Sequence, residues 1–416
     1  MNRLLLLLTT LTLCLPVGAQ QVRQDLYTSI PDQRIYRIPA IAKADDGTLI
    51  AISDCRYDHG SDVGNAKPID IMCRLSHDNG LTWESERELA DCHDAAYRGH
   101  VYGFGDAAVV ADRDSDRQMV LCVGDSTGRT VFQHGFQQVY RFYGTDHGAT
   151  WSRGENITSQ IYSLVPQLDC LFIGSGKIHQ SRYVKRGQYY RLYCALVSLH
   201  YGNAVIYSDD FGQTWSLLGT TESCCPEGDE PKTEELPDGS VILSSRTKGR
   251  WFNIFHFDDD TFTTGHWEQP ERARDIVCLD NACNGEILVL PVVDHQSGCA
   301  TWLALQSVPY GPKRTHVSIY YKPLSADAFC NPQSVSSGEP IAATLGQDWQ
   351  RYEVTTLDSG YSTFCLTADG HIAFLYERTS TPGSWQYDIC FERLSLDQIT
   401  DGRYALRQTL TNEDSR

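Results

Sequence analysis

The chain has 416 residues, of which 41% are hydrophobic and 21% are charged, and it carries a formal net charge of −18. This is the composition of a folded globular protein, and the length allows a large buried core. The strong negative charge argues against nucleic acid or an anionic membrane surface as a partner.

Residues 1–19 are expected to form a cleaved signal peptide and not a part of the fold. A short basic start is followed by an apolar run from Leu4 to Leu15, too short to span a membrane, and then by small residues before Gln20. A leucine precedes Cys14, which disfavours a lipid anchor at that cysteine. No later stretch is long and apolar enough for a transmembrane helix. We therefore expect an exported protein, periplasmic or extracellular, without a membrane anchor and with one domain over residues 20–416.

Cysteines are frequent: the chain has 15 of them, and 14 remain once Cys14 is removed with the signal peptide. Their spacing to histidines does not suggest a zinc site, and the chain contains no H-E-x-x-H motif. An oxidising compartment permits disulfides, but the sequence does not assign partners. We interpret most of these cysteines as small buried hydrophobic side chains or as structural bridges.

A short pattern recurs three times in the first half of the chain. The copies start at Ser76, Gly144 and Ser208, and after their first residue all read x-Asp-x-Gly-x-Thr-Trp. Their aspartates lie 68 and 64 residues apart, and each copy follows a β-like run. Degenerate versions lie near Phe257 to Trp267 and Ser325 to Phe329. Repetition at a fixed spacing indicates an array of similar structural units.

The residues of this pattern suit a tight hairpin turn. An aspartate can accept hydrogen bonds from the backbone N–H groups that follow it, and glycine adopts a positive φ without strain. The pattern resembles the Asp box of the sialidase superfamily, which caps a hairpin in a propeller blade. A spacing of about 65 residues fits one four-stranded blade with its loops, and the chain has room for about six blades. The resemblance therefore implies an all-β, six-bladed β-propeller, whose function must come from a site and not from the repeats.

Several further segments follow in chain order. The first is Tyr36-Arg37-Ile38-Pro39, and the second carries Arg56 shortly before Asp62 in a Gly-rich loop. Asp106 follows Gly105 in a third segment. Taken singly, each of these residues has an ordinary explanation as an ion pair or a turn residue.

The central segment contains three glutamates. Glu230 begins a run of the form E-x-x-x-x-E-hydrophobic, and Arg246 closes the β-like stretch that comes after it. Glu235 and Glu234 are the alternatives to Glu230 if the register of this run is different. Turn residues between the two stretches, Pro237-Asp238-Gly239, indicate a hairpin.

The last segments lie in the final third of the chain. Arg314 opens an alternating stretch that is predicted to be a strand, and Tyr361 lies in a Gly-Tyr-Ser-Thr segment. Another predicted strand, Ile372 to Tyr376, leads into Glu377. Together with the earlier segments, these residues resemble the exo-α-sialidases of bacteria and animals, in the order in which that family carries them. Thr363 departs from the family pattern, which often has Asp at that position.

The resemblance implies a role for each residue. Arg37, Arg246 and Arg314 would bind the carboxylate of sialic acid, because guanidinium groups bind carboxylates bidentately and stay charged. Tyr361 would be the nucleophile with Glu230 as its partner, and Asp62 would be the general acid and base. An uncharged phenol avoids the repulsion that a carboxylate nucleophile would meet at an anionic sugar. The supporting residues would be Glu377, Arg56 and Asp106.

The family resemblance also implies partners and alternatives. The substrates would be sialylated glycans on glycoproteins, glycolipids or oligosaccharides, and no metal or organic cofactor would be needed. A trans-sialidase or a nonulosonic-acid hydrolase of the same fold could carry the same residues. A non-catalytic propeller that only binds sialylated glycans is disfavoured, because binding alone requires neither a nucleophile nor its base.

Overall fold

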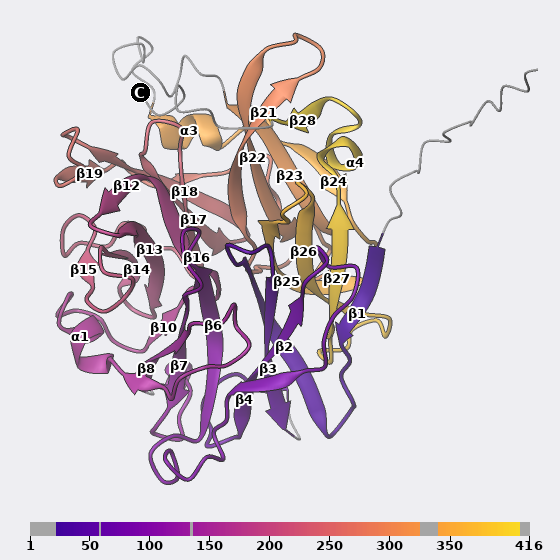
Figure 1. Ribbon diagram of the computed structural model, residues 1–416. Coiled ribbons are helices and arrows are strands. Elements are labelled where there is room, and N and C mark those ends of the chain that lie inside the picture. Colours follow the sequence, from indigo (N-terminus) through magenta and orange to yellow (C-terminus); the bar gives the residue numbers. More distant parts are fainter. Residues whose placement is uncertain (1–21, 58–59, 134–135, 325–339, 408–416) are drawn as a thin grey trace, which may run out of the picture.

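The structure is a computed structural model that describes residues 22–57, 60–133, 136–324 and 340–407. The expected signal peptide and the degenerate repeat near Ser325 to Phe329 lie outside the described residues, and both stay predictions. Strands dominate the fold (Figure 1). None of the helices in the described part of the chain is long and apolar enough to cross a membrane.

Three sheets are built from the first half of the chain. Within each sheet, consecutive strands pair antiparallel, and one short strand, β11, joins β6 in parallel. These sheets comprise β2 (Arg34–Lys43), β3 (Leu49–Tyr57), β4 (Ile69–Ser76) and β5 (Arg87–Ala90); β11 (Gly176–Lys177), β6 (Gly103–Ala111), β7 (Gln118–Asp125), β8 (Gln137–Gly144) and β9 (Glu155–Asn156); and β10 (Leu171–Ile173), β12 (His179–Arg186), β13 (Tyr189–Ser198), β14 (Gly202–Ser208) and β15 (Ser216–Leu217).

Three further sheets follow, and the last of them includes the first strand of the chain. They comprise β16 (Pro231–Glu235), β17 (Val241–Thr247), β18 (Gly249–Phe257), β19 (Gly265–Trp267) and β20 (Glu271–Arg272); β24 (Gln350–Glu353), β23 (Val317–Leu324), β22 (Ala300–Pro309), β21 (Ile287–Asp294) and β28 (Tyr404–Leu406); and β1 (Val22–Tyr27), β27 (Asp388–Leu394), β26 (Ile372–Thr379) and β25 (Asp358–Leu366). The helices are short: η1 (Val131–Gln133), α1 (Thr158–Tyr162), α3 (Ile341–Leu345) and α4 (Leu396–Thr400).

The six sheets form a closed ring. Strand β2 contacts β6 of the next sheet and β25 of the last sheet, and similar contacts join β6 to β10, β13 to β16, β16 to β21 and β22 to β25. Pairing of β1 with β27 ties the start of the described chain to its last sheet (Figure 1). This arrangement confirms the predicted six-bladed β-propeller.

The hydrophobic core is divided among the interfaces between neighbouring blades. Six clusters of buried side chains lie mainly between adjacent sheets. Strand β3 shows why its sequence is almost continuously apolar: Ile50 and Ile52 pack toward the blade of β6, and Leu49 and Ala51 pack toward the blade of β27. Successive side chains of a strand point to opposite faces, and in a propeller a neighbouring blade covers each face.

The three repeats are hairpin caps, as predicted. They connect β4 to β5, β8 to β9 and β14 to β15. In the third copy, Asp210 accepts hydrogen bonds from the Thr214 backbone N–H at 2.8 Å and from the Thr214 hydroxyl at 2.6 Å. Two residues with positive φ follow the aspartate, Phe211 at 57° and Gly212 at 79°. The second residue is a glycine in all three copies because this backbone conformation disfavours a side chain.

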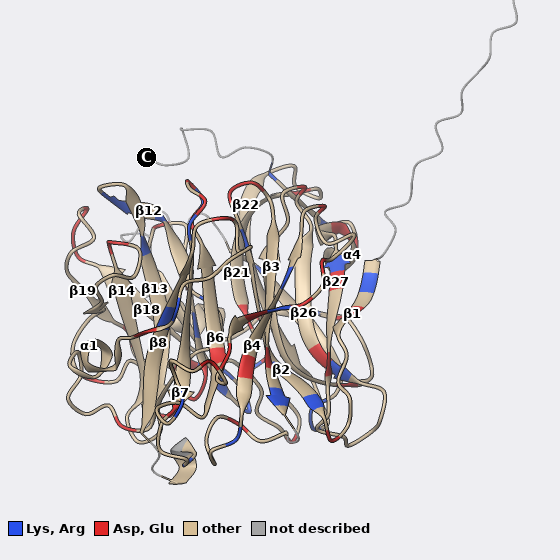
Figure 2. Ribbon diagram, turned by 60° about the horizontal axis from the view of Figure 1, so that its bottom comes forward, with Lys and Arg blue, Asp and Glu red and all other residues tan. Residues whose placement is uncertain are grey.

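The cysteines form no disulfide within the described part of the chain. All 13 cysteines found there are free thiols, and most of them are buried. The interpretation of these residues as small buried hydrophobic side chains is therefore confirmed, and the alternative of structural bridges is wrong for the described ones. Charged residues of both signs are interspersed over the loops and strands in the view of Figure 2.

Candidate active site

One cavity of about 260 Å³ brings together most of the predicted site residues. The predicted residues that line it are Arg37, Asp62, Asp106, Glu230, Arg246, Arg314 and Tyr361. They come from five of the six blades, and two of these blades supply two residues each. Side chains that are up to 324 residues apart in sequence therefore meet in one place.

Irregularities in three strands help to aim these side chains. The pairing of β2 with β3 shifts register after Arg37, that of β6 with β7 shifts around Asp106, and that of β25 with β26 shifts around Tyr361. Ile38 and Asp106 have positive φ values of 57° and 55°. A β-bulge leaves a residue unpaired and changes the direction of its side chain, and bulges are frequent next to active sites.

The hydroxyl of Tyr361 is hydrogen-bonded to a carboxylate and to a guanidinium group. This hydroxyl donates a hydrogen bond to Glu230 Oε1 at 2.6 Å and accepts one from Arg246 Nη1 at 2.8 Å. The same Arg246 nitrogen contacts Glu230 Oε2 at 2.8 Å. Burial raises the pKa of Tyr361 well above its ordinary value, and Glu230 raises it further, against a lowering by Arg246. The phenol is therefore neutral at working pH, and its proton already points at a carboxylate.

Three guanidinium groups surround the ring of Tyr361. The guanidinium carbons of Arg37, Arg246 and Arg314 lie 5.8, 5.8 and 5.2 Å from the centre of that ring. Arg37 is paired with Glu377, and Arg246 is paired with Glu230. The grouping of three cations in an acidic protein predicts a site for an anion.

Arg314 differs from the other two arginines. Its guanidinium makes no ion pair or hydrogen bond with any described residue, and it lies between two aromatic rings, 5.2 Å from Tyr361 and 5.2 Å from Trp385. Stacking on aromatic faces stabilises a guanidinium but leaves its N–H groups unsatisfied. Arg314 is therefore ready to bind an anion from solution.

Glu377 fixes the positions of two site residues. It is fully buried, and its Oε1 accepts hydrogen bonds from Arg37 Nε at 2.6 Å and from the Ile38 backbone N–H at 3.0 Å. Its Oε2 accepts a bond from the Tyr361 backbone N–H at 2.9 Å. Burial would raise the pKa of Glu377, but the charge of Arg37 and these hydrogen bonds hold it below its ordinary value. The close approach requires Gly360, because a Cβ there would lie 2.1 Å from Glu377 Oε2.

Asp62 is the exposed carboxylate of the site. Its side chain is 67% exposed, and its Oδ1 accepts a hydrogen bond from Arg56 Nη1 at 2.9 Å. Desolvation raises its pKa, but the charges of Arg56 and Arg37 outweigh this effect, so that the pKa of Asp62 lies below its ordinary value. Burial and the nearby Asp54 raise the pKa of Asp106 well above its ordinary value. The pKa values of Asp62 and Asp106 are therefore shifted in opposite directions.

Some expectations need correction. Arg56, predicted as a supporting residue that borders the sugar-binding pocket, does not line the cavity itself: it is fully buried, and it contacts Asp62 at 2.9 Å and Asp54 at 3.3 Å. Arg314 does not open a strand, because β23 begins only at Val317. The intervening His316 has a positive φ of 59°, which interrupts the extended backbone.

The alternative assignment of Glu234 or Glu235 as the partner of Tyr361 is wrong. Glu234 is fully buried and pairs with Lys177 at 2.6 Å and with Arg182 at 2.7 Å. Glu235 accepts hydrogen bonds from the Ser181 hydroxyl and the Arg182 backbone N–H. Glu230 is the glutamate of this segment that contacts Tyr361.

Two residues of the site were not found from the sequence. Trp385 lines the cavity from the loop between β26 and β27, and Asp229 contacts Arg246 Nε at 3.3 Å. The position of Asp229 next to Glu230 is a signal that could have indicated it. Trp385 lies in a loop without any repeated pattern, so its contact with Arg314 becomes visible only in three dimensions.

Comparison with known proteins agrees with this fold. The BNR/Asp-box repeat family matches residues 206–217. The chain is similar to a sialidase of Micromonospora viridifaciens, with 31% identity over 354 residues that cover 82% of this chain and 50% of that protein. It is also similar to a sialidase of Paraclostridium sordellii, with 25% identity over 298 residues that cover 68% of this chain and 70% of that protein.

A solved structure has the same fold at lower sequence identity. The intramolecular trans-sialidase from Ruminococcus gnavus, solved in complex with oseltamivir carboxylate, is 16% identical and superposes with a TM-score of 0.67. The match covers 90% of this chain and 98% of that one. At this identity the likeness shows the fold alone.

Fold and site together define a six-bladed propeller with an arginine-rich cavity. Its similarity to bacterial sialidases supports the class of glycoside hydrolases. The chain carries the BNR/Asp-box repeat and is similar to bacterial sialidases. It spans half the length of the Micromonospora protein, so its own activity, substrate and partners are matters for proposal.

Proposed function

We propose that the protein is an exo-α-sialidase that removes terminal, α-ketosidically linked sialic acid from glycans. The observation that carries this proposal is the grouping of Arg37, Arg246 and Arg314 around a tyrosine that is already hydrogen-bonded to Glu230. Sialic acid has a carboxylate on its anomeric carbon, so its binding requires fixed cations beside the reacting centre.

The first half of the proposed reaction forms a covalent intermediate. The three arginines bind the substrate carboxylate, and Asp62 donates a proton to the glycosidic oxygen as the bond to the leaving group breaks. The Tyr361 oxygen attacks the anomeric carbon and transfers its proton to Glu230, which lies 2.6 Å away. A neutral phenol approaches the anionic sugar without charge repulsion, which a carboxylate nucleophile would not.

The second half releases the sugar with retention of configuration. Asp62, now ionised, removes a proton from a water molecule, and this water attacks the anomeric carbon from the side that the leaving group occupied. The bond to Tyr361 breaks, and the tyrosine takes back its proton from Glu230. Each residue returns to its starting protonation state.

Binding of the substrate supports the role of Asp62 as an acid. In the free protein the charges of Arg56 and Arg37 favour its ionised form. A bound carboxylate neutralises part of the positive charge of Arg37 and Arg314, so the pKa of Asp62 should rise when the substrate is in place. The acid would thus be protonated mainly in the complex in which its proton is needed.

The substrates proposed are sialylated glycoproteins, glycolipids and oligosaccharides. We also propose export to the periplasm or the cell exterior, where such glycans are found, on the basis of the N-terminal segment. No residue of the cavity requires a metal or an organic cofactor for the steps above.

The test is a Tyr361→Phe variant assayed on a fluorogenic aryl sialoside. Removal of the nucleophile is expected to reduce kcat/KM by about 10³-fold or more, equivalent to at least about 4 kcal/mol of transition-state stabilisation. Tyr387→Phe is the matched control: its ring faces Arg37 at 5.2 Å, and its hydroxyl has no part in the reaction. Unchanged turnover by a folded Tyr361→Phe protein would refute the mechanism.

Analysis of the products by mass spectrometry distinguishes hydrolysis from its relatives. Free sialic acid supports the proposed hydrolase. An anhydro sugar would indicate an intramolecular trans-sialidase, and transfer to an added glycan would indicate a trans-sialidase.

A further inference from the structure

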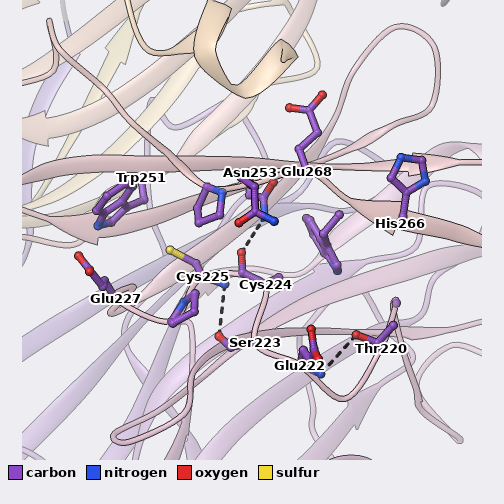
Figure 3. A pocket seen from close by; sticks show the side chains of 15 residues that line it. Thr220, Glu222, Ser223, Cys224, Cys225, Glu227, Trp251, Asn253, His266 and Glu268 are labelled. Atoms are coloured by element: carbon purple, nitrogen blue, oxygen red, sulfur yellow. Dashed lines mark hydrogen bonds between the residues drawn. The ribbon is translucent and has the colours of Figure 1, made fainter. Parts of the chain in front are cut away.

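A second cavity lies away from the predicted catalytic residues, between two blades. It has a volume of about 680 Å³, larger than the cavity at Tyr361, and we call it the Trp251 groove. Its walls come from the segment after β15 and from β18, β19 and the start of the loop that leads to β20. Figure 3 shows Trp251 and Glu227 at one end of the groove and His266 at the other.

Two indole rings give the Trp251 groove its apolar surface. Trp267 is fixed: its Nε1 donates a hydrogen bond to the Leu218 carbonyl at 3.0 Å, and its ring packs edge-on against Phe255 at 5.3 Å. Trp251 is partly exposed, and its indole N–H donates to no residue in the described part of the chain. An indole with one apolar face and a free N–H is suited to a ligand that is apolar on one side and polar on the other.

The charges of the Trp251 groove define what it can bind. Glu222, Glu227 and Glu268 line it, and no described lysine or arginine does. The carboxylate of Glu268 is hydrogen-bonded to His256 Nε2 at 2.7 Å and to a backbone N–H of α3. The exposed carboxylates of Glu222 and Glu227 accept no hydrogen bond from a described residue. The available polar groups are therefore mainly acceptors with negative charge, which favour hydroxyl donors and repel anions.

The Trp251 groove is separate from the cavity at Tyr361, but it lies on the blade that carries Arg246. Trp251 pairs with Ser245 across β17 and β18, one position from Arg246. The wall residue Glu227 precedes Asp229 and Glu230 by only a few residues. A glycan held in the groove would thus be bound beside the blade that carries part of the active site.

We propose that the Trp251 groove binds neutral saccharide units, such as hexoses and N-acetylhexosamines, and does not bind sialic acid. The C–H face of a neutral pyranose ring packs on an indole, and its hydroxyls donate to the free carboxylates. The anionic sugar that the arginine cavity selects is excluded from the groove by charge. Binding here requires none of the catalytic residues, so it does not depend on the proposed activity.

The test is a binding titration of the full protein with an asialo N-acetyllactosamine oligosaccharide, followed by saturation-transfer NMR. The wild-type protein and Tyr102→Ala are expected to bind it equally, since Tyr102 is a half-exposed aromatic residue that lines neither cavity. Trp251→Ala is expected to weaken binding at least about tenfold, the value of a lost stacking contact. All three proteins should cleave an aryl sialoside at the same rate.

A charge-reversal variant provides the second arm. The wild-type protein is expected not to bind an oligosaccharide of glucuronic acid in the groove, whereas Glu222→Lys combined with Glu227→Lys should bind it. Absence of binding of the neutral oligosaccharide, or equal binding by Trp251→Ala, would overturn the proposal. A protein that binds the neutral oligosaccharide but cleaves no sialoside would refute the proposed activity and leave the groove proposal intact.

Discussion

Replacement of Glu377 by glutamine should damage stability and activity together, because this carboxylate holds both Arg37 and Tyr361. Each oxygen of Glu377 accepts one hydrogen bond from Arg37 and one from a backbone N–H. Glutamine has the same shape, but its NH2 group replaces one of these acceptors with a donor. Arg37 is 5% exposed and would remain as a buried charge without its partner. Removal of one member of a buried ion pair costs about 3–5 kcal/mol, a large part of a typical unfolding free energy.

A matched variant separates the effect of Glu377→Gln on stability from its effect on activity. Glu392→Gln also removes a fully buried carboxylate, but its partner Arg23 has a side chain that is 39% exposed and can be solvated by water. Urea unfolding should therefore show a smaller loss for Glu392→Gln than for Glu377→Gln. For activity, a displacement of about 1 Å at the reacting groups costs roughly 10²-fold, so kcat/KM should fall by about that factor in Glu377→Gln only. Equal kinetics in the two variants would refute the positioning role of Glu377.

Three further outcomes are expected. Arg314→Lys should raise KM for an aryl sialoside about tenfold, because the variant loses one bidentate contact worth about 1.4 kcal/mol. Its circular dichroism spectrum should stay unchanged. An unaltered KM would show that Arg314 is not part of the anion site. The pH profiles of kcat and of kcat/KM should differ, because a bound substrate carboxylate offsets the positive charges that lower the pKa of Asp62 in the free protein. Activity requires the protonated form of Asp62, so kcat should persist to higher pH than kcat/KM. If both profiles fall at the same pH, Asp62 is not the acid. Asp210→Ala should lower the unfolding free energy by about 1–2 kcal/mol through loss of its hydrogen bonds to Thr214, without effect on kcat/KM, and a catalytic defect in a folded variant would show that the repeat does more than cap a hairpin.

The propeller was predictable because its main signal is local. In the third repeat, the hydrogen bonds of Asp210 reach no further than Ser208 and Thr214, so eight residues are enough to recognise the turn. Their spacing then gives the size of a blade. Closure of the ring by β1 and β27 joins the two ends of the chain and has no comparable local signal.

The site was predictable in its members and only partly in its geometry. The order of arginines, acids and tyrosine indicated the residues, including Tyr361 and Glu230, whose contact spans 131 residues. The sequence did not reveal that Arg56 is fully buried, because burial depends on the packing of other blades. It also did not reveal that Arg314 is the arginine without a carboxylate partner, since that depends on which side chains the neighbouring loops bring to it.

The Trp251 groove was not predicted either. Its two indoles, Trp251 and Trp267, belong to neighbouring strands of one blade, but the opposite wall around Glu222 comes from the preceding blade. In the sequence these residues have the ordinary appearance of strand aromatics and loop acids. Only the contact between two blades makes them a common surface.

The most direct measurement of the central claim is the identification of the residue that becomes attached to the sugar. Incubation with a fluorinated sialosyl fluoride slows hydrolysis of the glycosyl–enzyme, and digestion with mass spectrometry then locates the added mass. The mechanism predicts one sialosyl adduct on the peptide that contains Tyr361, and none in Tyr361→Phe. An adduct on Asp62 or Glu230 would contradict the account.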